Sequence, residues 1–394
     1  MTTVQRISLD PPVPGTHERE LASRVFFVSE AILDFSLVRS EKGTGAVEVV
    51  VKEGTDIGEL ARKLRFVVAN DILGQRQLEP KVVWRAATTG KARDVFDDMV
   101  QRGIAFEAGE GQVTVGEPFL SLMDYFDSRF AALAIEGFDA RERRYPTLIP
   151  TAVMRRCGYF QSFPQLLMFV SRLHGDTETY RDFRAEDAAG LDLTNGLRAH
   201  CDNFDYCLPP TMCFHTYHEL TSRPLPTPTL AVTARGKSFR FESRYRRSLE
   251  RLWDFTIREI VFLGSRDYVL TSRRRLMEQG CELIDSLGLG GRCEVATDPF
   301  FVGSDTVERV WSQQLLELKY ELRLPLDADR DVAVGSFNFH EQFFGTSFGI
   351  TTDAGVAYTS CAGIGLERLA YTFLCRYGLD PNDWPAEVRK AVPQ

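Results

Sequence analysis

The stretch 239–259, FRFESRYRRSLERLWDFTIRE, limits what this chain can fold into more than any other part. Arg240 and Glu242 lie two residues apart, so on an extended strand both side chains leave the same face and can meet one ligand. The basic run 244–247 then predicts a loop, and a second apolar run follows, which together indicate strand, loop and strand. A guanidinium beside a carboxylate suits an adenine nucleotide, whereas a surface hairpin with solvated charges is the alternative for a bare pair.

A second segment, TSCAGIGLERL at 359–369, predicts a strand that runs through two glycines into a helix. Arg368 would lie on the first turn of that helix, where the positive end of the helix dipole and the guanidinium both favour phosphate. Taken alone, this pattern is also that of an ordinary strand-to-helix turn.

Together, FRFE at 239–242 with Arg251 and GIGLER at 363–368 resemble motifs 2 and 3 of class II aminoacyl-tRNA synthetases. The resemblance is closer to the zinc-dependent seryl-tRNA synthetases of methanogens, and closest to their truncated relatives, the amino acid:[carrier protein] ligases. It covers about residues 116–394. The supporting segments are RYPTLIP (144–150), CGYFQSFPQLL (157–167), PPTMCFH (209–215), WDFTIREIVFLG (253–264), VGSFNFHEQFFG (334–345) and SCAGIGLERL (360–369).

This resemblance implies an α+β fold, in which helices flank the antiparallel sheet of class II synthetases, and an ATP-dependent ligase. It implies four catalytic residues, Arg240, Glu242, Arg251 and Arg368, with Arg368 on the γ-phosphate. The implied ATP-binding set is Arg240, Glu242, Arg251, Leu252, Glu317, Val332, Ala333, Val334, Gly335 and Arg368.

The resemblance also implies a zinc site formed by Cys213, Glu259 and Cys361, with Glu259 next to the bound substrate. Two thiolates and a carboxylate leave the fourth zinc position open for the amine of an amino acid. Judged by residue type alone, such a dispersed trio is more often two core cysteines and a surface acid. A local rival is Cys213-x-His215-x-x-His218, but an extended strand would put the two histidines on opposite faces, so we interpret both as structural or as contacts of the metal ligands.

Magnesium is also implied, although its ligands are open. The related enzymes carry an acidic ligand near 332–334, where this chain has Val-Ala-Val. Glu317 and Lys319 are candidates for magnesium or phosphate, and the alternative is a solvated helix face.

Residues 1–115 form a separate mixed α/β module of open role. Its pattern predicts a strand at 46–51, a helix from Ile57 with Leu60, Leu64 and Val68 on one face, a helix at 95–101 and a hairpin at 104–115. Residues 116–394 form the catalytic domain. There we expect a helix at 118–135, a strand in 144–150 at a homodimer interface, and a helical insertion at about 270–325 with helices at 272–287 and 305–322.

Composition and charge limit which kinds of partner we expect for this chain. The net charge of −8 gives no general footprint for nucleic acid, although basic patches exist. No apolar run reaches the ~20 residues of a membrane span, and the polar start lacks a signal peptide, so we expect a cytoplasmic protein without a membrane partner. The other six cysteines lack zinc-finger spacing and indicate core or incidental thiols.

The leading hypothesis is therefore a ligase that activates glycine, alanine or serine with ATP at zinc and loads it onto the phosphopantetheine arm of a holo carrier protein. The first alternative is a zinc-dependent seryl-tRNA synthetase, which needs a broader basic surface for tRNA than the charge suggests. The third hypothesis is an inactive paralogue with a binding role. Retention of Arg240, Glu242, Arg251 and Arg368 argues against it, because a regulator needs no complete nucleotide site.

Overall fold

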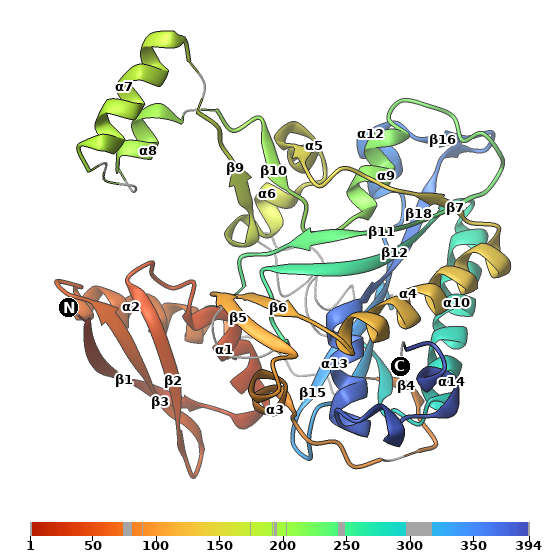
Figure 1. Cartoon of the computed structure of the whole chain (residues 1–394), viewed down its shortest axis with the longest axis horizontal. Coiled ribbons are helices and arrows are strands. Elements are labelled where there is room, and N and C mark those ends of the chain that lie inside the picture. Colours follow the sequence, from red (N-terminus) through yellow and green to blue (C-terminus); the bar gives the residue numbers. More distant parts are fainter. Residues whose placement is uncertain are drawn as a thin grey trace.

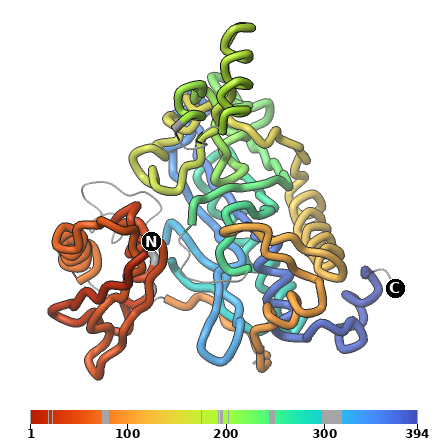
Figure 2. Tube along the Cα trace, turned by 60° about the vertical axis from the view of Figure 1, so that its left-hand side comes forward, coloured from red at the N-terminus to blue at the C-terminus, as the bar shows by residue number. Residues whose placement is uncertain are grey.

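A computed structural model describes residues 2–73, 81–88, 90–173, 175–190, 192, 195–201, 203–242, 249–296 and 317–392. In these ranges the chain forms a small N-terminal module beside a larger α+β body (Figures 1 and 2). None of the helices in the described part is long and apolar enough to cross a membrane.

The N-terminal module is a three-stranded antiparallel sheet in the order β1-β3-β2. Its elements are β1 (Thr2–Val13), α1 (Glu18–Val25), β2 (Ile32–Ser40), β3 (Gly43–Lys52) and α2 (Ile57–Val67). Asp56 starts α2 by accepting a hydrogen bond from the backbone N–H of Glu59 at 3.0 Å. Leu60 and Leu64 of α2 are buried against the sheet, so the expected helix and its apolar face are confirmed.

The body is built on an eight-stranded sheet in the order β4-β13-β14-β15-β18-β12-β11-β7. The strands are β4 (Val82–Arg85), β7 (Arg141–Arg143), β11 (Leu230–Phe239), β12 (Asp254–Gly264), β13 (Arg292–Val295), β14 (Lys319–Pro325), β15 (Asp331–Phe339) and β18 (Tyr358–Gly365). Every pair is antiparallel except the edge pair β7–β11. The expected antiparallel sheet is therefore confirmed, and β12 and β18 pair at its centre.

Helices cover one face of this sheet (Figure 1). They are α4 (Phe119–Phe138), α10 (Arg266–Ser286) and α13 (Leu366–Tyr377). Their apolar residues form the main core with the sheet, and this core includes Phe126, Leu276 and Phe373. A second core lies on the opposite face, around Tyr217, Val261 and Phe344. The sheet is thus packed on both faces, and any cavity next to it must lie within the second layer.

The second layer is formed by short elements. They are β8 (Ile149–Pro150), α5 (Thr151–Arg156), α6 (Tyr159–Ser162), β9 (Met168–Val170), β10 (Tyr206–Leu208), α9 (Cys213–Glu219), α12 (Phe343–Phe348), β16 (Thr351–Thr352) and β17 (Gly355–Val356). Strands β8, β10 and β9 form a small antiparallel sheet. Beyond it, α7 (Thr177–Ala188) and α8 (Asn195–His200) project away from the body (Figure 1).

The core of the N-terminal module and the main core of the body are not separated at residue 115. The core of the N-terminal module ends at Ile72, and β4 already pairs with β13 in the body. The elements between them and α4, namely α3 (Phe96–Gln101) and the hairpin of β5 (Ala105–Gly109) and β6 (Gln112–Val115), have the predicted positions. Val95, Met99 and Ala105 are buried in the main core. By packing, residues 82–115 therefore belong to the body.

Two other expectations need correction. In the expected helical insertion, α10 extends over Arg266–Ser286, but β13 and β14 are strands of the sheet. The expected helix 305–322 is a strand from Lys319, and residues 305–316 lie outside the described part. In the RYPTLIP segment only Ile149 and Pro150 are in a strand. The edge strand β7, which pairs with β11 through Arg141–Arg143, ends just before this segment.

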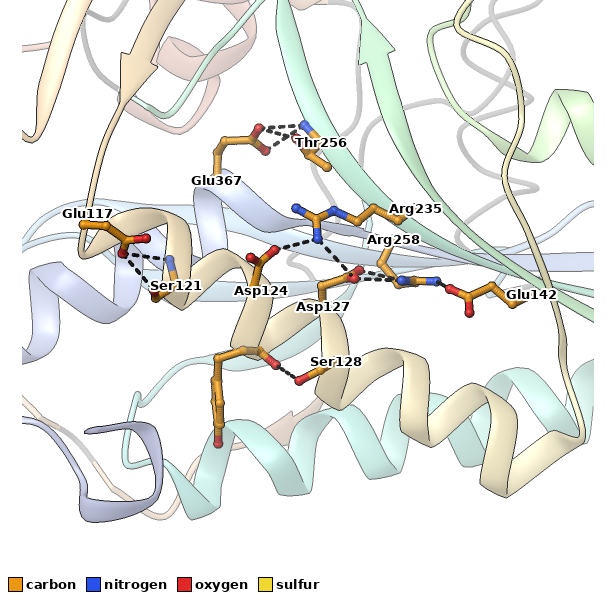
Figure 3. Close-up of polar contacts among 11 residues, drawn as sticks. Glu117, Ser121, Asp124, Asp127, Ser128, Glu142, Arg235, Thr256, Arg258 and Glu367 are labelled. Atoms are coloured by element: carbon orange, nitrogen blue, oxygen red, sulfur yellow. Dashed lines mark hydrogen bonds and ion pairs between the residues drawn. The ribbon is translucent and has the colours of Figure 1, made fainter. Parts of the chain in front are cut away.

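A buried ion pair fixes α4 to the sheet (Figure 3). Arg258 of β12 is 2% exposed, and its Nε and Nη2 donate to the two carboxylate oxygens of Asp127 on α4 at 2.7 Å each. Its Nη1 donates to Glu142 of β7 at 3.1 Å. The hydrogen bonds to Asp127 and Glu142 raise the pKa of Arg258, against the effect of burial, which alone would lower it. The guanidinium therefore stays charged and ties helix, central strand and edge strand together.

We expect Asp127→Asn to destabilise the body by about 3 to 5 kcal/mol, because it leaves the buried Arg258 without its bidentate partner. Asp124→Asn is a matched control, since Asp124 is on the same helix and pairs with Arg235, but its side chain is 67% exposed. That control should cost no more than about 1 kcal/mol. Urea unfolding measures both, and equal losses would contradict a special role for the buried pair.

Candidate active site

A cavity of about 320 Å³ opens on the sheet face opposite α4 and α10. Strands β12, β14, β15 and β18 form its floor, and side chains from α6, α9, α12 and α13 contribute to its walls. Its two ends differ in chemistry. One is lined by Cys213, Glu259 and Cys361, and the other by Arg240 and Arg368.

The first end holds the Cys–Glu–Cys cluster, which we define as Cys213, Glu259 and Cys361. One potential ligand atom from each residue lies within 4.8 Å of the other two, and all three residues are buried. Cys213 is the first residue of α9, Glu259 is on β12, and Cys361 is on β18. Because Val261 and Cys361 are register partners, Glu259 and Cys361 lie on neighbouring strands and face the same side of the sheet. The fold therefore brings together three residues that are far apart in sequence.

Polar side chains around the cluster hold these groups in place. Thr211 Oγ1 donates to Glu259 Oε2 at 2.6 Å and lies 3.8 Å from Cys213 Sγ. Asn338 Nδ2 donates to Cys361 Sγ at 3.6 Å. His340 Nε2 lies 3.6 Å from the same sulfur, and its Nδ1 is within 3.3 Å of hydroxyl oxygens of Tyr217 and Thr359. Neither Asn338 nor His340 was predicted from the sequence, although Asn338 on β15 and His340 just after its end are two residues apart, a spacing that favours one face of an extended chain.

The protonation chemistry of the cluster fits a cation. Burial raises the pKa of Cys213 to about 11 and that of Glu259 above its usual value. The neighbouring Cys213 thiol and burial raise the pKa of Cys361 well above its usual value. Burial thus disfavours the charged form of all three groups, and a cation bound between them would favour it.

The donor set is also that of zinc. Two thiolates and one carboxylate are typical zinc ligands, and a tetrahedral ion holds such donors roughly 3.5 to 4 Å apart. The donor atoms of the cluster approach that spacing, so small side-chain rotations bring them to one ion. With only three protein ligands, one position remains for a substrate atom.

The other end of the cavity contains the Arg-x-Glu pair that the sequence singled out. Arg240 and Glu242 follow β11 directly, and both line the cavity, whereas Phe241 between them is absent from its lining. The backbone N–H of Arg240 donates to the Trp253 carbonyl at 3.0 Å, which continues the ladder between β11 and β12. Strands lie on both sides of the loop as predicted, but β11 ends at Phe239 and β12 begins at Asp254, so Arg240, Glu242 and Arg251 lie outside them. The basic run 244–247 lies outside the described residues.

Cationic side chains surround Glu242. Burial alone would raise its pKa, but Arg251, Arg240 and Arg368 hold it below the usual value. Arg251 Nη1 donates to Glu242 Oε2 at 2.7 Å. Arg251 itself is absent from the described cavity lining, so in this structure it contacts Glu242 and not the open space.

Arg368 lies on the first turn of α13, as the glycine-rich segment predicted. Its Nε donates to the Glu250 carbonyl at 2.7 Å and its Nη1 to the Ala333 carbonyl at 3.1 Å. Burial, together with Arg251, lowers its pKa to about 10. We call Arg240, Glu242, Arg251 and Arg368 the arginine clamp.

Not every predicted nucleotide residue lines the cavity. Leu252, Ala333, Val334 and Gly335 do, but Val332 points into the main core. Glu317 is also outside the lining, where it contacts Lys81 and Tyr320. Val332 and Glu317 therefore do not line this cavity, and their contact with the nucleotide stays a prediction.

Strand β14 supplies an acid that sequence analysis missed. Lys319 and Glu321 alternate along β14 and both line the cavity, so the expected helix face is in fact a strand face. Glu321 is the register partner of Ser336, beside the segment 333–335 that carries no acidic residue. Burial opposes ionisation of Glu321, yet Lys319 and Arg323 lower its pKa. The alternation Lys-x-Glu-x-Arg at 319–323 was the available signal.

The rival histidine site does not form in the described part of the chain. Residues 213–219 are helical and not extended, which corrects the geometry expected for His215 and His218. His215 is buried and stacks on Tyr145 with ring centroids 5.3 Å apart, whereas His218 is exposed. Burial lowers the pKa of His215 to about 4. Neither histidine belongs to the ligand cluster that the described residues form.

Comparisons with known proteins agree with this geometry. No family model matches the sequence. The chain is similar to amino acid–[acyl-carrier-protein] ligase 1 of Bradyrhizobium diazoefficiens, with 35% identity over 274 residues that cover 68% of this chain and 82% of that protein. It is also similar to a type-2 serine–tRNA ligase of Methanococcus aeolicus, with 30% identity over 72% of this chain and 56% of that protein.

Among solved structures, the fold is similar to that of M. kandleri SerRS in complex with A. aeolicus tRNASec. The TM-score is 0.71 at 22% identity, and the match covers 100% of this chain and 80% of that chain. The α+β fold of class II synthetases, expected from the two motifs, is thus confirmed.

We propose that the Cys–Glu–Cys cluster binds zinc, and expect the purified protein to contain about one zinc ion per chain. Cys361→Ala should remove most of this metal, because two donors hold the ion far more weakly than three. Cys375→Ala is the matched control, since Cys375 is equally buried but lies in α13 outside the cluster. Elemental analysis of the folded variants decides the point: equal zinc contents in the two variants would contradict the assignment.

Proposed function

This chain belongs to the family of amino acid–[acyl-carrier-protein] ligases, and on that premise we propose that it activates a small amino acid with ATP and transfers it to the phosphopantetheine thiol of a carrier protein. The observation that carries the proposal is one continuous cavity lined by the Cys–Glu–Cys cluster at one end and by Arg240, Glu242 and Arg368 at the other. Such a cavity can hold both reactants of an adenylation side by side.

The cluster is suited to bind the amino end of the substrate. Zinc bound there supplies a Lewis-acidic position that takes a neutral amine. Thr211 keeps the Glu259 carboxylate oriented, and Asn338 and His340 contact the Cys361 sulfur. Fixing the amine at this end directs the carboxylate of the amino acid toward the arginine clamp, and such alignment is a large part of what catalysis requires.

The arginine clamp is suited to bind ATP. Arg240 and Arg368 line the cavity and carry positive charge toward the phosphates, while Glu242 offers an acceptor for the exocyclic amine of adenine. Helix α13 begins at the same place, so its N-terminal dipole adds to the guanidinium of Arg368. We propose that magnesium accompanies the phosphates. Glu321 is the acidic lining residue next to 333–335, although Lys319 and Arg323 already compensate its charge.

The first chemical step needs no general base, because the substrate carboxylate is itself the nucleophile. One carboxylate oxygen forms a bond to the α-phosphorus, the bond from that phosphorus to the bridging oxygen breaks, and pyrophosphate leaves. Charge builds up on the phosphate oxygens, where the arginines stabilise it. In the second step the thiol sulfur forms a thioester to the carbonyl carbon, AMP leaves with the carboxyl oxygen, and the thiol proton passes to solvent.

Bulky side chains next to the cluster limit the size of the amino acid. Phe214 and Phe344 line the cavity beside the Cys–Glu–Cys cluster. We therefore propose glycine, alanine or serine as the substrate class. A homodimer, as expected for the class II fold, belongs to the same proposal.

We expect amino-acid-dependent exchange of labelled pyrophosphate into ATP with at least one of glycine, alanine and serine. Arg368→Ala should lower this exchange by about 10²- to 10³-fold, because it removes one preorganised charge from the transition state. Arg389→Ala, which changes an exposed arginine on α14 (Ala386–Arg389), is the control and should leave the rate unchanged. Absence of exchange with all three amino acids would refute the proposed activation.

The second candidate function, charging of tRNA with serine, is favoured by the similarity to a type-2 serine–tRNA ligase. An acceptor assay separates the two functions. We expect labelled amino acid to become attached to a holo carrier protein and not to bulk tRNA. The apo carrier protein, which lacks the phosphopantetheine thiol, is the matched control and should stay unlabelled. Labelling of tRNA in place of the carrier protein would establish the second candidate.

A further inference from the structure

Phe241, between the clamp residues Arg240 and Glu242, makes contacts that the proposed chemistry does not use. Phe241 lies outside the cavity lining, while its neighbours Arg240 and Glu242 both line it. This is the alternation of an extended backbone, which sends successive side chains to opposite sides. A shift of Phe241 would therefore also move Arg240 and Glu242, its neighbours in the backbone.

Phe241 packs within an aromatic group that includes the N-terminal module. Its ring centroid lies 5.9 Å from that of Phe26 and 6.3 Å from that of Phe27, both of which directly follow α1. On the body side, Trp253 lies 4.6 Å from Phe241. These separations are those of favourable aromatic pairs. We call Phe26, Phe27, Phe241 and Trp253 the aromatic latch.

The latch joins the core of one module to the nucleotide site of the other. Phe26 packs against the buried core of the N-terminal module and also contacts Phe27, at a centroid distance of 5.4 Å. Trp253 Nε1 donates to the Glu242 carbonyl at 2.8 Å, and the backbone N–H of Trp253 donates to the Gly111 carbonyl at 2.7 Å. An added Cβ at Gly111 would lie 2.4 Å from the Trp253 ring, so this contact leaves no space for a larger residue. Both views of the chain show the module beside the body (Figures 1 and 2).

We propose that Phe26 and Phe27 position the arginine clamp, so that the N-terminal module is part of the ATP site without contacting ATP. Trp253 and the ladder of β11 and β12 hold the backbone at 240–242, and the two phenylalanines of the module add contacts to the ring of Phe241. Without the latter contact, Phe241 loses two aromatic neighbours and the clamp residues are less preorganised for phosphate. This inference rests on the proposed function, because it assigns ATP to that end of the cavity.

The latch predicts a specific effect on nucleotide binding. Phe27→Ala should weaken ATP binding roughly two- to tenfold, the range that loss of an aromatic pair supports. Zinc content should not change, because the Cys–Glu–Cys cluster is at the other end of the cavity. Phe27→Tyr, which retains the aromatic ring, should bind ATP with the affinity of the wild-type protein. Phe66→Ala is the matched control, since Phe66 lies on α2 of the same module and is 62% exposed.

Calorimetric titration of the full chain with ATP, in the absence of amino acid, measures these affinities directly. In the double variant Phe27→Ala/Phe241→Ala, the loss should be smaller than the product of the two single losses, because both remove the same contact. Unchanged ATP affinity of Phe27→Ala, or an equal loss in Phe66→Ala, would overturn the latch. Wild-type protein that binds ATP but exchanges no pyrophosphate would refute the proposed ligase function instead, and the variants would still decide the latch.

Discussion

The site and the main core both depend on one feature of the central strand β12: its neighbouring residues Arg258 and Glu259 point to opposite faces of the sheet. Arg258 points to the helix layer and binds Asp127 of α4, whereas Glu259 points to the cavity, where Thr211 holds its carboxylate. Because a one-residue slip would exchange the two sides, the buried ion pair of Arg258 and the position of the Glu259 carboxylate in the cavity depend on the same strand register. Any shift of β12 would also move β18, which carries Cys361 and leads into Arg368.

This arrangement explains how a single sheet holds two kinds of chemistry in one cavity. The strands β12 and β18 run from the Cys–Glu–Cys cluster to the arginine clamp, so both ends share rigid backbone. Gly363 leaves space for both side chains beside it, because an added Cβ would lie 2.8 Å from Ile257 and close to the Glu259 carboxylate. The aromatic latch extends the same principle to the N-terminal module, which reaches the clamp through Phe241.

Local patterns predicted the parts of the fold that local geometry decides. Alternation placed Arg240 and Glu242 on one face, and the glycines before Arg368 predicted a strand that ends in a helix. Tertiary packing decided the rest: Phe214 and Tyr217 pack on Phe344 and make 213–219 a helix. The role of Glu321 depends on strand pairing with β15, and the contact between Phe27 and Phe241 joins residues more than 200 positions apart. No single-sequence pattern contains such information.

We propose that the Cys–Glu–Cys cluster binds the amine of the amino acid in the same cavity that would bind ATP. Replacement of the metal by Co²⁺ gives a visible spectrum that changes when a ligand enters the open position of a tetrahedral site. Titration with the activated amino acid should change this spectrum, and its N-acetyl derivative, which lacks a basic amine, should not. An identical response to both compounds, or no response to the free amino acid, would contradict amine binding at the cluster.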